Sequence, residues 1–423
     1  MPKTDRHAII YGASGLIGWA VVNQLLSSYP ERGTFKKVTA VTNRPLNLAE
    51  THWPTGQPGQ PELQLISGVD LRSAHELEHQ IPDIETVTHV YYLAFTANSN
   101  ALDEVAINSQ MFSTVIAAHN TLSPDLEFVA FAGGTRGYGI YTPGGTFQPP
   151  LSEDLVHALP EDVAKTVVYP VYRQILTTAS ANKSWTWCEV CPDAIIGFTP
   201  NGSQFSLALH WAQYLSLYAY NHDVGPRTAS GDREASAESG AVEVPFPGVQ
   251  AAADAKFSPV SSATLVRFMV FASLRPGQCG GGRLFNVADC EEVTYGELWG
   301  AIAGWFGLVG GKPVEVEGGN VGDEPGEETV GAGEMPAGQG TVLTPGEYVG
   351  KYRDVFRRCG CERGFNCGVG AGARQLDSVG YWLTFDRQLD CEKLKATGFE
   401  PPQDPVQGWW EAFALFRDAG LIL

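Results

Sequence analysis

The sequence predicts an α/β protein: a doubly wound parallel sheet followed by a smaller, mainly helical C-terminal region. The first reason is a glycine-rich loop at residues 12–18, between a short apolar segment at 9–11 and a helical pattern at 16–28. The second is that β-rich and helical stretches alternate from there to about residue 308. Such alternation is typical of a parallel sheet with helices on both faces.

The glycine loop has the spacing expected of a dinucleotide site. Its first glycine lets the chain leave the strand sharply, the second lets backbone N–H groups approach a pyrophosphate, and the third lets the helix pack closely. The helix N-terminus would face the phosphates. The alternative is a turn that serves packing only. The residues expected to contact the cofactor here are Gly12, Ser14, Gly15, Leu16, Ile17 and Gly18.

The end of the second predicted strand, at residues 38–42, indicates which dinucleotide is bound. NAD enzymes carry an acidic residue there for the ribose hydroxyls, whereas this chain has Asn43-Arg44-Pro45. A guanidinium stacks on adenine and pairs with a 2′-phosphate, which a carboxylate would repel. We therefore expect NADPH/NADP+ as the cofactor. The alternative is that Arg44 is a solvated loop charge.

Further strands are predicted at residues 62–71, 88–96 and 126–132, a strand followed by a loop that closes over the nicotinamide at 185–197, and a late strand at 283–288. Because ligands bind at the carboxyl ends of parallel strands, cofactor contacts are expected where these strands end. A long helix is predicted at 103–121, and another contains Tyr169 and Arg173. The additional residues expected to contact the cofactor are Asp70, Leu71, Ala94, Phe95, Thr96, Pro192, Ala194 and Ile195.

The order of the predicted strands, helices and insertions also predicts the domain organisation. Residues 1–197 are expected to bind the dinucleotide, and residues 198–423 to form the substrate-binding region, interleaved with late sheet elements at 260–290. Helical patterns occupy 206–220, 261–273, 294–306 and 408–416. Two stretches poor in apolar residues, 226–242 and 309–346, are predicted to be flexible insertions.

Charge and cysteine usage exclude several classes of protein. A net charge of −19 in 423 residues argues against binding to nucleic acid or to an anionic membrane surface. We see no N-terminal signal and no apolar run of the roughly 18–20 residues that span a bilayer. The eight cysteines are scattered, and their spacing does not suit a metal site. A cytoplasmic protein with free thiols and no metal is expected.

The candidate catalytic group is a tyrosine. In Tyr169-Pro170-Val171-Tyr172-Arg173 a tyrosine precedes a base by four residues, as in the Y-x-x-x-K pattern of short-chain dehydrogenases, with arginine in place of lysine. When hydride arrives at a carbon, charge develops on an oxygen, which a tyrosine hydroxyl stabilises or protonates.

Several motifs together resemble the progesterone 5β-reductase/iridoid synthase-like (PRISE) branch of the short-chain dehydrogenase/reductase superfamily, in particular its fungal members. The resemblance spans roughly residues 6–308 and the C-terminal helices, and implies a Rossmann fold of the extended type. It also implies that Asp70 and Leu71 lie against the adenine. The matching segments are 12–18, 43–45, 134–138, 191–198, 244–248 and 284–287.

In that branch the catalytic lysine follows the fifth strand and the tyrosine lies in an N-F-Y-Y-x-x-E-D motif. Carried over, these positions are Arg136 and Tyr169. Arginine orients a ribose and lowers the pKa of a tyrosine, but it does not relay a proton as lysine does. The branch reduces enone C=C bonds by 1,4-hydride addition, where an oxyanion partner matters more than a proton relay.

The resemblance therefore implies an NADPH-dependent reductase of an apolar conjugated carbonyl, acting on an enone C=C or a C=O bond, in secondary metabolism. The alternatives are a redox-neutral isomerase or cyclase that retains NADP, and a non-catalytic NADP-binding regulator. A terpenoid-, steroid- or polyketide-like substrate is expected, and a homodimer is left open. The residues expected to contact the substrate are Tyr138, Phe205 and Trp211.

Overall fold

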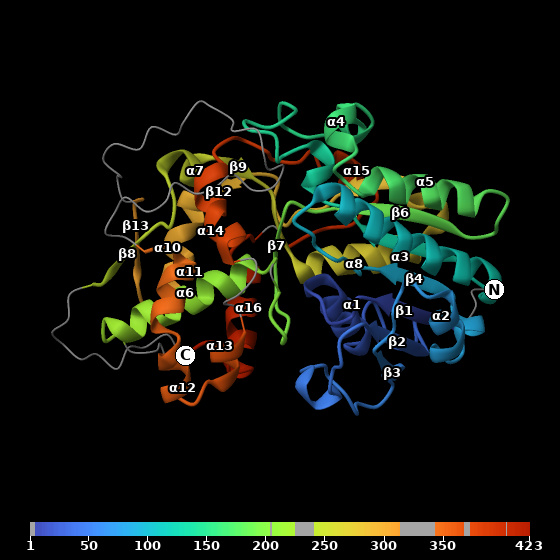
Figure 1. The fold of residues 1–423 in the computed structure, drawn as a ribbon, viewed down its shortest axis with the longest axis horizontal. Coiled ribbons are helices and arrows are strands. Elements are labelled where there is room, and N and C mark those ends of the chain that lie inside the picture. Colours follow the sequence, from blue (N-terminus) through green and yellow to red (C-terminus); the bar gives the residue numbers. More distant parts are fainter. Residues whose placement is uncertain (1–4, 204, 225–240, 314–342, 368–372, 403) are drawn as a thin grey trace.

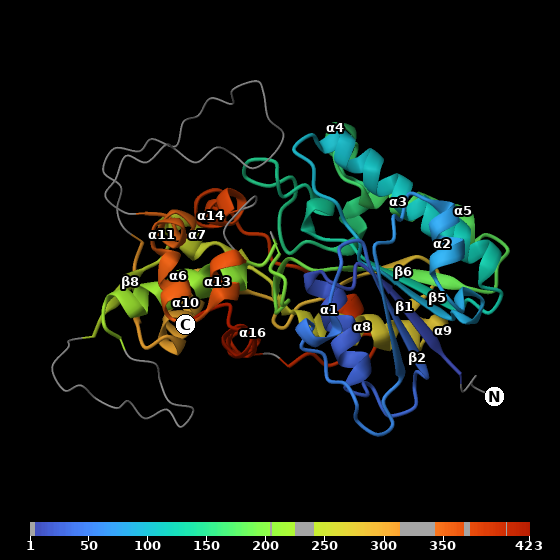
Figure 2. The same cartoon turned by 60° about the horizontal axis from the view of Figure 1, so that its bottom comes forward.

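A computed structural model describes residues 5–203, 205–224, 241–313, 343–367, 373–402 and 404–423. Two lobes lie side by side, with strand β7 between them (Figure 1). One lobe contains a central sheet, and the other consists mainly of helices, as seen again after rotation (Figure 2). Most of the insertion predicted at 226–242 lies outside the described residues.

The central sheet has seven strands in the order β11-β6-β5-β4-β1-β2-β3, and every pairing is parallel. The order reverses at β1, so the sheet is doubly wound, which confirms the predicted fold class. Its strands are β1 (His7–Tyr11), β2 (Lys37–Thr42), β3 (Glu62–Ser67), β4 (His89–Tyr92), β5 (Phe128–Ala132), β6 (Thr186–Cys191) and β11 (Arg283–Asn286).

The inner strands are apolar at nearly every position because both faces of the sheet are covered. Successive side chains of a strand point to opposite faces. In β1, Ala8 and Ile10 join one hydrophobic cluster, whereas Ile9 and Tyr11 join the other. Alternate apolar residues thus anchor a helical layer on each side of the sheet.

Helices α1 and α8 pack against each other on one face of the sheet, while α2, α3 and α5 form the layer on the other face (Figures 1 and 2). Helix α8 contacts both β5 and β6. The short helix α9 also contacts β6. The bounds are α1 (Leu16–Leu26), α2 (Ala74–Gln80), α3 (Ala101–Leu122), α4 (Glu161–Ala164), α5 (Tyr169–Ser180), α8 (Ser262–Ser273) and α9 (Pro276–Cys279).

The second lobe is built around α6 (Leu207–Asn221), which contacts α11, α14 and α16. Three pairs of short strands accompany these helices: β7 (Ala194–Ile196) with β10 (Pro259–Ser261), β8 (Glu243–Pro245) with β13 (Val309–Gly311), and β9 (Lys256–Phe257) with β12 (Val293–Thr294). Its remaining helices are α7 (Gln250–Asp254), α10 (Tyr295–Trp305), α11 (Pro345–Tyr352), α12 (Asp354–Arg358), α13 (Glu362–Asn366), α14 (Ala373–Trp382) and α16 (Gln407–Asp418), whereas α15 (Glu392–Lys395) contacts β11 of the central sheet.

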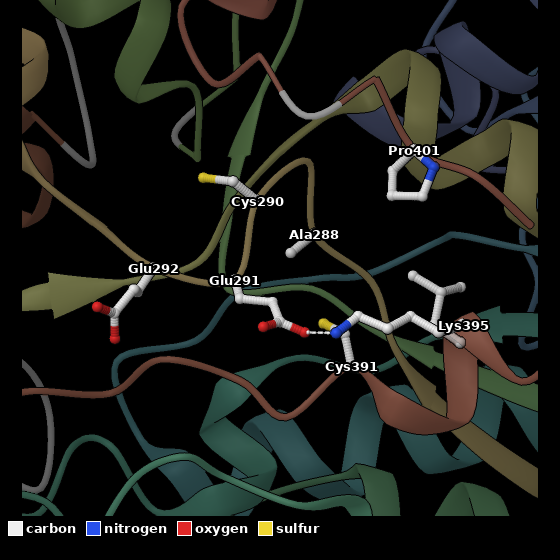
Figure 3. A pocket seen from close by; sticks show the side chains of 8 residues that line it. Ala288, Cys290, Glu291, Glu292, Cys391, Lys395 and Pro401 are labelled. Carbon is white, nitrogen blue, oxygen red and sulfur yellow. Dashed lines mark ion pairs between the residues drawn. The ribbon is translucent and has the colours of Figure 1, made fainter.

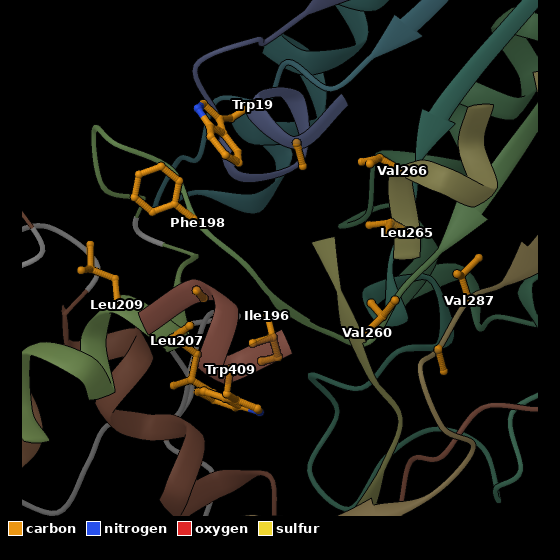
Figure 4. Packing of buried hydrophobic residues seen from close by; sticks show 14 of the residues in the cluster. Trp19, Ile196, Phe198, Leu207, Leu209, Val260, Leu265, Val266, Val287 and Trp409 are labelled. Carbon is orange, nitrogen blue, oxygen red and sulfur yellow. The ribbon is translucent and has the colours of Figure 1, made fainter. Parts of the chain in front are cut away.

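One hydrophobic cluster extends from the sheet face that α1 and α8 cover into this lobe (Figure 4). Trp19 of α1 packs edge-on against Phe198, with ring centroids 4.8 Å apart, and Phe198 contacts Phe416 of α16 at 5.3 Å. The continuous core fixes the C-terminal lobe beside the N-terminus of α1. The lobe therefore lies next to the loop expected to bind the dinucleotide.

Of the insertion predicted at 309–346, residues 314–342 lie outside the described residues. Its first residues form an ordered strand, β13, and its last residues begin α11, whose Pro345 occupies the first helical turn. At 185–197 the sequence predicts a strand followed by a loop, whereas the structure has two strands there, β6 and β7, on either side of Pro192. Proline has no N–H to donate, so the ladder stops there and the chain turns into the second lobe.

Candidate active site

The residues predicted to bind the dinucleotide follow the ends of β1, β2, β3, β4 and β6. Because all these strands are parallel, their carboxyl ends share one edge of the sheet. The structure therefore brings the predicted contacts to a single edge, beside the order reversal at β1. Ligands of doubly wound sheets bind at such a crevice.

The glycine loop is shaped by close backbone approaches. Gly12 has φ of +82°, and a Cβ there would lie 2.6 Å from the carbonyl oxygen of Leu93. A Cβ on Gly18 would lie 2.1 Å from the carbonyl oxygen of Gly12. No side chain fits at either position, which agrees with the turning and packing functions expected for these glycines.

The N-terminus of α1 suits a phosphate group. Gly15 is the N-cap residue and supplies no side-chain hydrogen bond, and the first turn holds no acidic residue. Backbone hydrogen bonds fasten the loop to β2, since the N–H groups of Gly12 and Ala13 both donate to the carbonyl of Val41 at 3.1 Å. Thr199 donates to the carbonyl of Ser14 at 3.0 Å. These features fit the pyrophosphate of a dinucleotide.

Arg44 lies after β2 in an exposed segment with Asn43 and Pro45. Asn43 donates to the carbonyl of Val69 at 3.3 Å, which ties this segment to the end of β3. Within the described residues the Arg44 guanidinium pairs with no carboxylate, so its charge is available to a ligand. Its place beyond β2 fits the position expected for the 2′-phosphate.

The ends of β3 and β4 are also fixed by local contacts. The Asp70 carboxylate accepts hydrogen bonds from Arg72, which lower the pKa of Asp70, and Leu71 is buried. After β4, the partly exposed Ala94 and Phe95 lead to Thr96. The backbone of Thr96 is held on both sides by the buried amide of Asn108, at 2.9 and 2.8 Å. The loop above the expected cofactor position is thereby fastened to α3.

Tyr169 is the first residue of α5 and keeps part of its surface exposed. A Cβ on Gly134 would lie 3.2 Å from the Tyr169 hydroxyl oxygen and 3.7 Å from the carbonyl oxygen of Pro192. The hydroxyl is therefore beside the turn after β5 and the loop after β6. Burial raises the pKa of Tyr169, and the charge of Arg136 opposes that rise. The hydroxyl thus stays protonated at neutral pH.

Arg136 belongs to the 3-10 turn η3 (Thr135–Tyr138), directly after β5. Its Nη1 atom donates to Oε1 of Glu104 at 2.7 Å, and the Glu104 side chain is 8% exposed. The other carboxylate oxygen of Glu104 accepts the N–H of Asn98 at 3.2 Å. The guanidinium also lies over the ring of Tyr141, 5.1 Å from its centroid. Glu104 therefore neutralises and orients Arg136 at the sheet edge.

A second ion pair borders Tyr169. Arg173, one helical turn further along α5, donates from Nε to Glu189 of β6 at 2.7 Å. Burial raises the pKa of Glu189 to about 7, although the adjacent Arg173 charge opposes the rise. Sequence reasoning placed a base four residues after the tyrosine, and the structure pairs that base with a carboxylate instead of leaving it free.

The residues predicted to contact substrate lie in different surroundings. Tyr138 is 1% exposed and donates its hydroxyl to Oδ1 of Asn286 at 2.6 Å. Trp211 is equally buried and stacks on Trp409, with centroids 5.3 Å apart. Phe205 is 44% exposed and meets the ring of Phe95 edge-on at 6.0 Å. Of the three, only Phe205 combines an accessible ring with a neighbour at the cofactor edge.

Sequence reasoning missed the buried charges around η3 and Tyr169: Glu104, Glu189, Asp193 and Arg387. Glu104 stands in the first turn of a helix, where acidic residues are common for reasons of the helix dipole alone. Glu189 gave a usable signal, because it is a single carboxylate inside the apolar strand β6. Nothing in the sequence near Arg387 indicates its partner.

A cavity of about 300 Å³ lies away from these residues, between the chain after β11 and α15 (Figure 3). Glu291 and Lys395 form an ion pair across it. No group of three or more potential metal ligands occurs within the described residues. Among the helices that the structure describes, none is both long and apolar enough to cross a membrane. The cavity is lined by Ala288, Cys290, Glu291, Glu292, Cys391, Leu394, Lys395 and Pro401.

The family is decided by a match to the PRISE-like Rossmann-fold domain over residues 8–423. The chain belongs to this family. The short chain dehydrogenase sirQ of Leptosphaeria maculans is 31% identical, covering 98% of this chain and 97% of its own length. The 3-oxo-Delta(4,5)-steroid 5-beta-reductase of Arabidopsis thaliana is 24% identical over 71% of this chain and 69% of its own length. The resemblance found in the sequence motifs is thereby confirmed.

Solved structures extend the similarity of fold beyond this family. The Bordetella bronchiseptica enzyme WbmH, in complex with NAD+, aligns over 98% of this chain and 99% of its own, with a TM-score of 0.56 and 13% identity. The UDP-glucose 4-epimerase of Thermus thermophilus, in complex with NAD, aligns over 96% of this chain and 99% of its own, with a TM-score of 0.53 and 15% identity. Both likenesses concern the fold of the PRISE-like chain, including its C-terminal lobe.

Proposed function

We propose that this PRISE-like protein is an NADPH-dependent reductase of an apolar conjugated carbonyl, with Tyr169 as the catalytic residue. The observation that carries the proposal is the position of the Tyr169 hydroxyl, 3.2 Å from where a Cβ on Gly134 would lie, between the turn after β5 and the loop after β6. Relatives named as a steroid 5-beta-reductase and as (S)-8-oxocitronellyl enol synthases support the class of reaction.

Tyr169 would stabilise the oxygen on which charge develops. Because burial raises its pKa, the hydroxyl is a hydrogen-bond donor at neutral pH and not a base. Such a donor stabilises an enolate by a hydrogen bond to its oxygen, and it also protonates that oxygen when the reaction requires a proton there. The accessible ring of Phe205, next to Phe95, offers an apolar surface to the body of the substrate.

Arg136 would orient Tyr169 and the cofactor ribose. Its Nε atom is buried without a hydrogen-bond partner among the described residues, so it has a donor available for a ligand oxygen. The 2.7 Å contact with Glu104 offsets its charge, so Tyr169 is not forced toward the phenolate. This arrangement suits stabilisation of an oxyanion better than a proton relay.

NADPH would lie along the sheet edge, with its pyrophosphate at the N-terminus of α1 and its 2′-phosphate at Arg44. When bound, it supplies the hydride. Ala94, Phe95 and Thr96 would cover one side of it, and Pro192, Ala194 and Ile195 the side near the nicotinamide. The exposed charge of Arg44, which pairs with no carboxylate in the described part of the chain, supports NADPH over NADH.

A redox-neutral isomerase or cyclase is the second candidate. It is favoured by the ion pairs of Arg136 and Arg173, because neither arginine can shuttle a proton as the family lysine does. Such an enzyme would hold the same cofactor without consuming it.

Loss of NADPH absorbance during incubation with a panel of apolar enones tests the proposal. Matched saturated ketones serve as controls, and NADP+ binding is measured in parallel. Enone-dependent oxidation is expected. Tight NADP+ binding without oxidation on any enone or ketone would contradict the proposal and favour the redox-neutral candidate.

A further inference from the structure

A segment near the C-terminus returns from the helical lobe to the sheet edge. Within residues 386–391, here called the return segment, Leu389 forms a parallel bridge with Leu151. The N–H of Leu151 donates to Gln388 at 2.8 Å, and the N–H of Asp390 donates to Leu151 at 3.0 Å. The N–H of Arg387 donates to Lys256 at 2.8 Å. Main-chain hydrogen bonds thus fix the return segment between the lobes.

Arg387 carries a charge from this segment into the interior. It is 1% exposed, and its Nε atom lies 3.2 Å from Oδ2 of Asp193, whose side chain is 4% exposed. The other carboxylate oxygen of Asp193 accepts the hydroxyl of Thr135 at 2.9 Å. Thr135 also donates its N–H to the carbonyl of Pro192 at 3.2 Å. A chain of contacts therefore runs from the return segment to the first residue of η3.

The last residue of η3 is joined to the same segment by a separate route. Tyr138 donates its hydroxyl to Asn286 at 2.6 Å, and the Asn286 amide donates to the carbonyl of Asp390 at 2.8 Å. Both ends of the turn are therefore connected to residues 387–390. Arg136, whose guanidinium borders Tyr169, lies between these two ends.

We propose that the return segment positions η3, the turn that carries Arg136, and that Arg387 is a positioning residue acting through Asp193 and Thr135 on Arg136. An ion pair removed from water is a weak source of stability, because desolvation offsets the attraction. Its benefit is geometric: it fixes where a turn of four residues stands relative to α5 and the loop after β6. The kinetic part of this inference rests on the proposed function, but the structural part does not.

Thr135→Val tests the connection with little disturbance, because it removes the donated hydroxyl while leaving the Arg387–Asp193 pair in place. Thr135→Ser restores the donor. Amide hydrogen exchange of residues 133–139 is expected to quicken about tenfold in Thr135→Val, with α1 unchanged and Thr135→Ser close to the unsubstituted protein. Arg387→Met is expected to quicken exchange in the same residues, to a larger extent.

His210→Gln is the matched control. It breaks another buried pair, in which the His210 ring lies 2.7 Å from Asp377 within the helical lobe. Because no hydrogen bond among the described residues leads from this pair to η3, exchange at 133–139 should not change. Quickened exchange there in His210→Gln, or none in Thr135→Val, would overturn the structural part of the inference, whether or not the protein reduces an enone.

Turnover supplies the second readout. If unsubstituted protein oxidises NADPH with an enone, Thr135→Val should lower kcat about tenfold while KM for NADPH and NADP+ affinity stay the same. Thr135→Ser should recover kcat. Equal losses in kcat and in NADP+ affinity, or an unchanged kcat, would show that the contact serves stability alone.

Discussion

At the scale of single residues, the proposed chemistry depends on Tyr169 and its charged neighbours. The hydroxyl lies beside η3 and close to two ion pairs, Arg136 with Glu104 and Arg173 with Glu189. Burial keeps the Tyr169 phenol protonated, and a protonated phenol is a hydrogen-bond donor. Arg136 stands where the resemblance to the family places a lysine, and in the proposed reaction it would orient Tyr169 without transferring a proton.

Tyr169→Phe is expected to lower enone-dependent turnover about 100-fold, because the donor to the developing oxyanion is lost. NADP+ affinity should be unchanged, since the ring stays in place. Tyr172→Phe is the matched control: the Tyr172 hydroxyl is buried and lies 3.4 Å from the carbonyl of Asn108. If Tyr172→Phe lost turnover and Tyr169→Phe did not, the catalytic assignment would be wrong. Steady-state kinetics and fluorescence titration provide both measurements.

Arg44→Ala should weaken NADPH binding roughly 10- to 100-fold and leave NADH binding unchanged, because only NADPH carries the phosphate that a guanidinium would pair with. Arg32→Ala removes the same charge from an exposed position between α1 and β2, at the opposite edge of the sheet, and should affect neither cofactor. Isothermal titration with both cofactors distinguishes the two outcomes. Equal weakening of NADPH and NADH would refute the selectivity assigned to Arg44.

The glycine loop and α1 act as one element, since the helix begins where the loop folds back on β1. A Cβ on Gly18 would lie 2.1 Å from the carbonyl oxygen of Gly12. The oxygen is a backbone atom, and the backbone of Gly18 sets the position of the Cβ, so neither atom can move without displacing the loop. The loop geometry and the position of the helix are therefore fixed together.

Gly18→Ala is expected to lower the free energy of unfolding by about 1–3 kcal/mol through this clash and to abolish tight NADP+ binding. Gly300→Ala is the control, because Gly300 is also inside a helix, α10, yet a Cβ there would contact nothing within 4 Å. That variant should gain about 0.5–1 kcal/mol from helix propensity and keep full NADP+ affinity. Chemical denaturation and titration measure both. Equal stability of the two variants would contradict the packing assigned to Gly18.

An element could be predicted from the sequence where residues close to it in the chain determine it, and not where distant segments do. The strands of the sheet and α1, α6, α8 and α10 follow from apolar periodicity, and the cofactor edge follows from the glycine loop and from strand ends. The short strand after Pro192, β7, and the ordered ends of the 309–346 segment were missed because partners distant in sequence decide them: β7 pairs with β10, and β13 pairs with β8. The Arg387–Asp193 contact joins residues far apart in the chain, and no local pattern indicates it.

At the scale of the whole molecule, the two lobes share one hydrophobic cluster and a set of buried polar contacts. The proposed cofactor contacts lie at the sheet edge, and the return segment is joined by hydrogen bonds to η3. We therefore expect stability and chemistry to be coupled at this junction. The buried carboxylate of Glu189 makes that coupling depend on pH.

Burial raises the pKa of Glu189 from its ordinary value of 4.5 to about 7. Between these values the unfolded chain releases the proton before the folded protein does, so folding becomes less favourable as pH rises. Relative to Glu189→Gln, the unsubstituted protein should lose about 3 kcal/mol of unfolding free energy between these two pH values, and the difference should be constant outside them. Urea denaturation across this range measures it. A difference that does not vary with pH would contradict the raised pKa.

The central claim is that this chain transfers hydride to a conjugated carbonyl with help from Tyr169. The most direct measurement uses NADPH deuterated at C4 and follows the label into an apolar enone by mass spectrometry and NMR. We expect deuterium at the β-carbon of the enone with unsubstituted protein, and about 100-fold slower labelling with Tyr169→Phe. Tight cofactor binding with no deuterium in any product, or labelling unaffected by Tyr169→Phe, would contradict it.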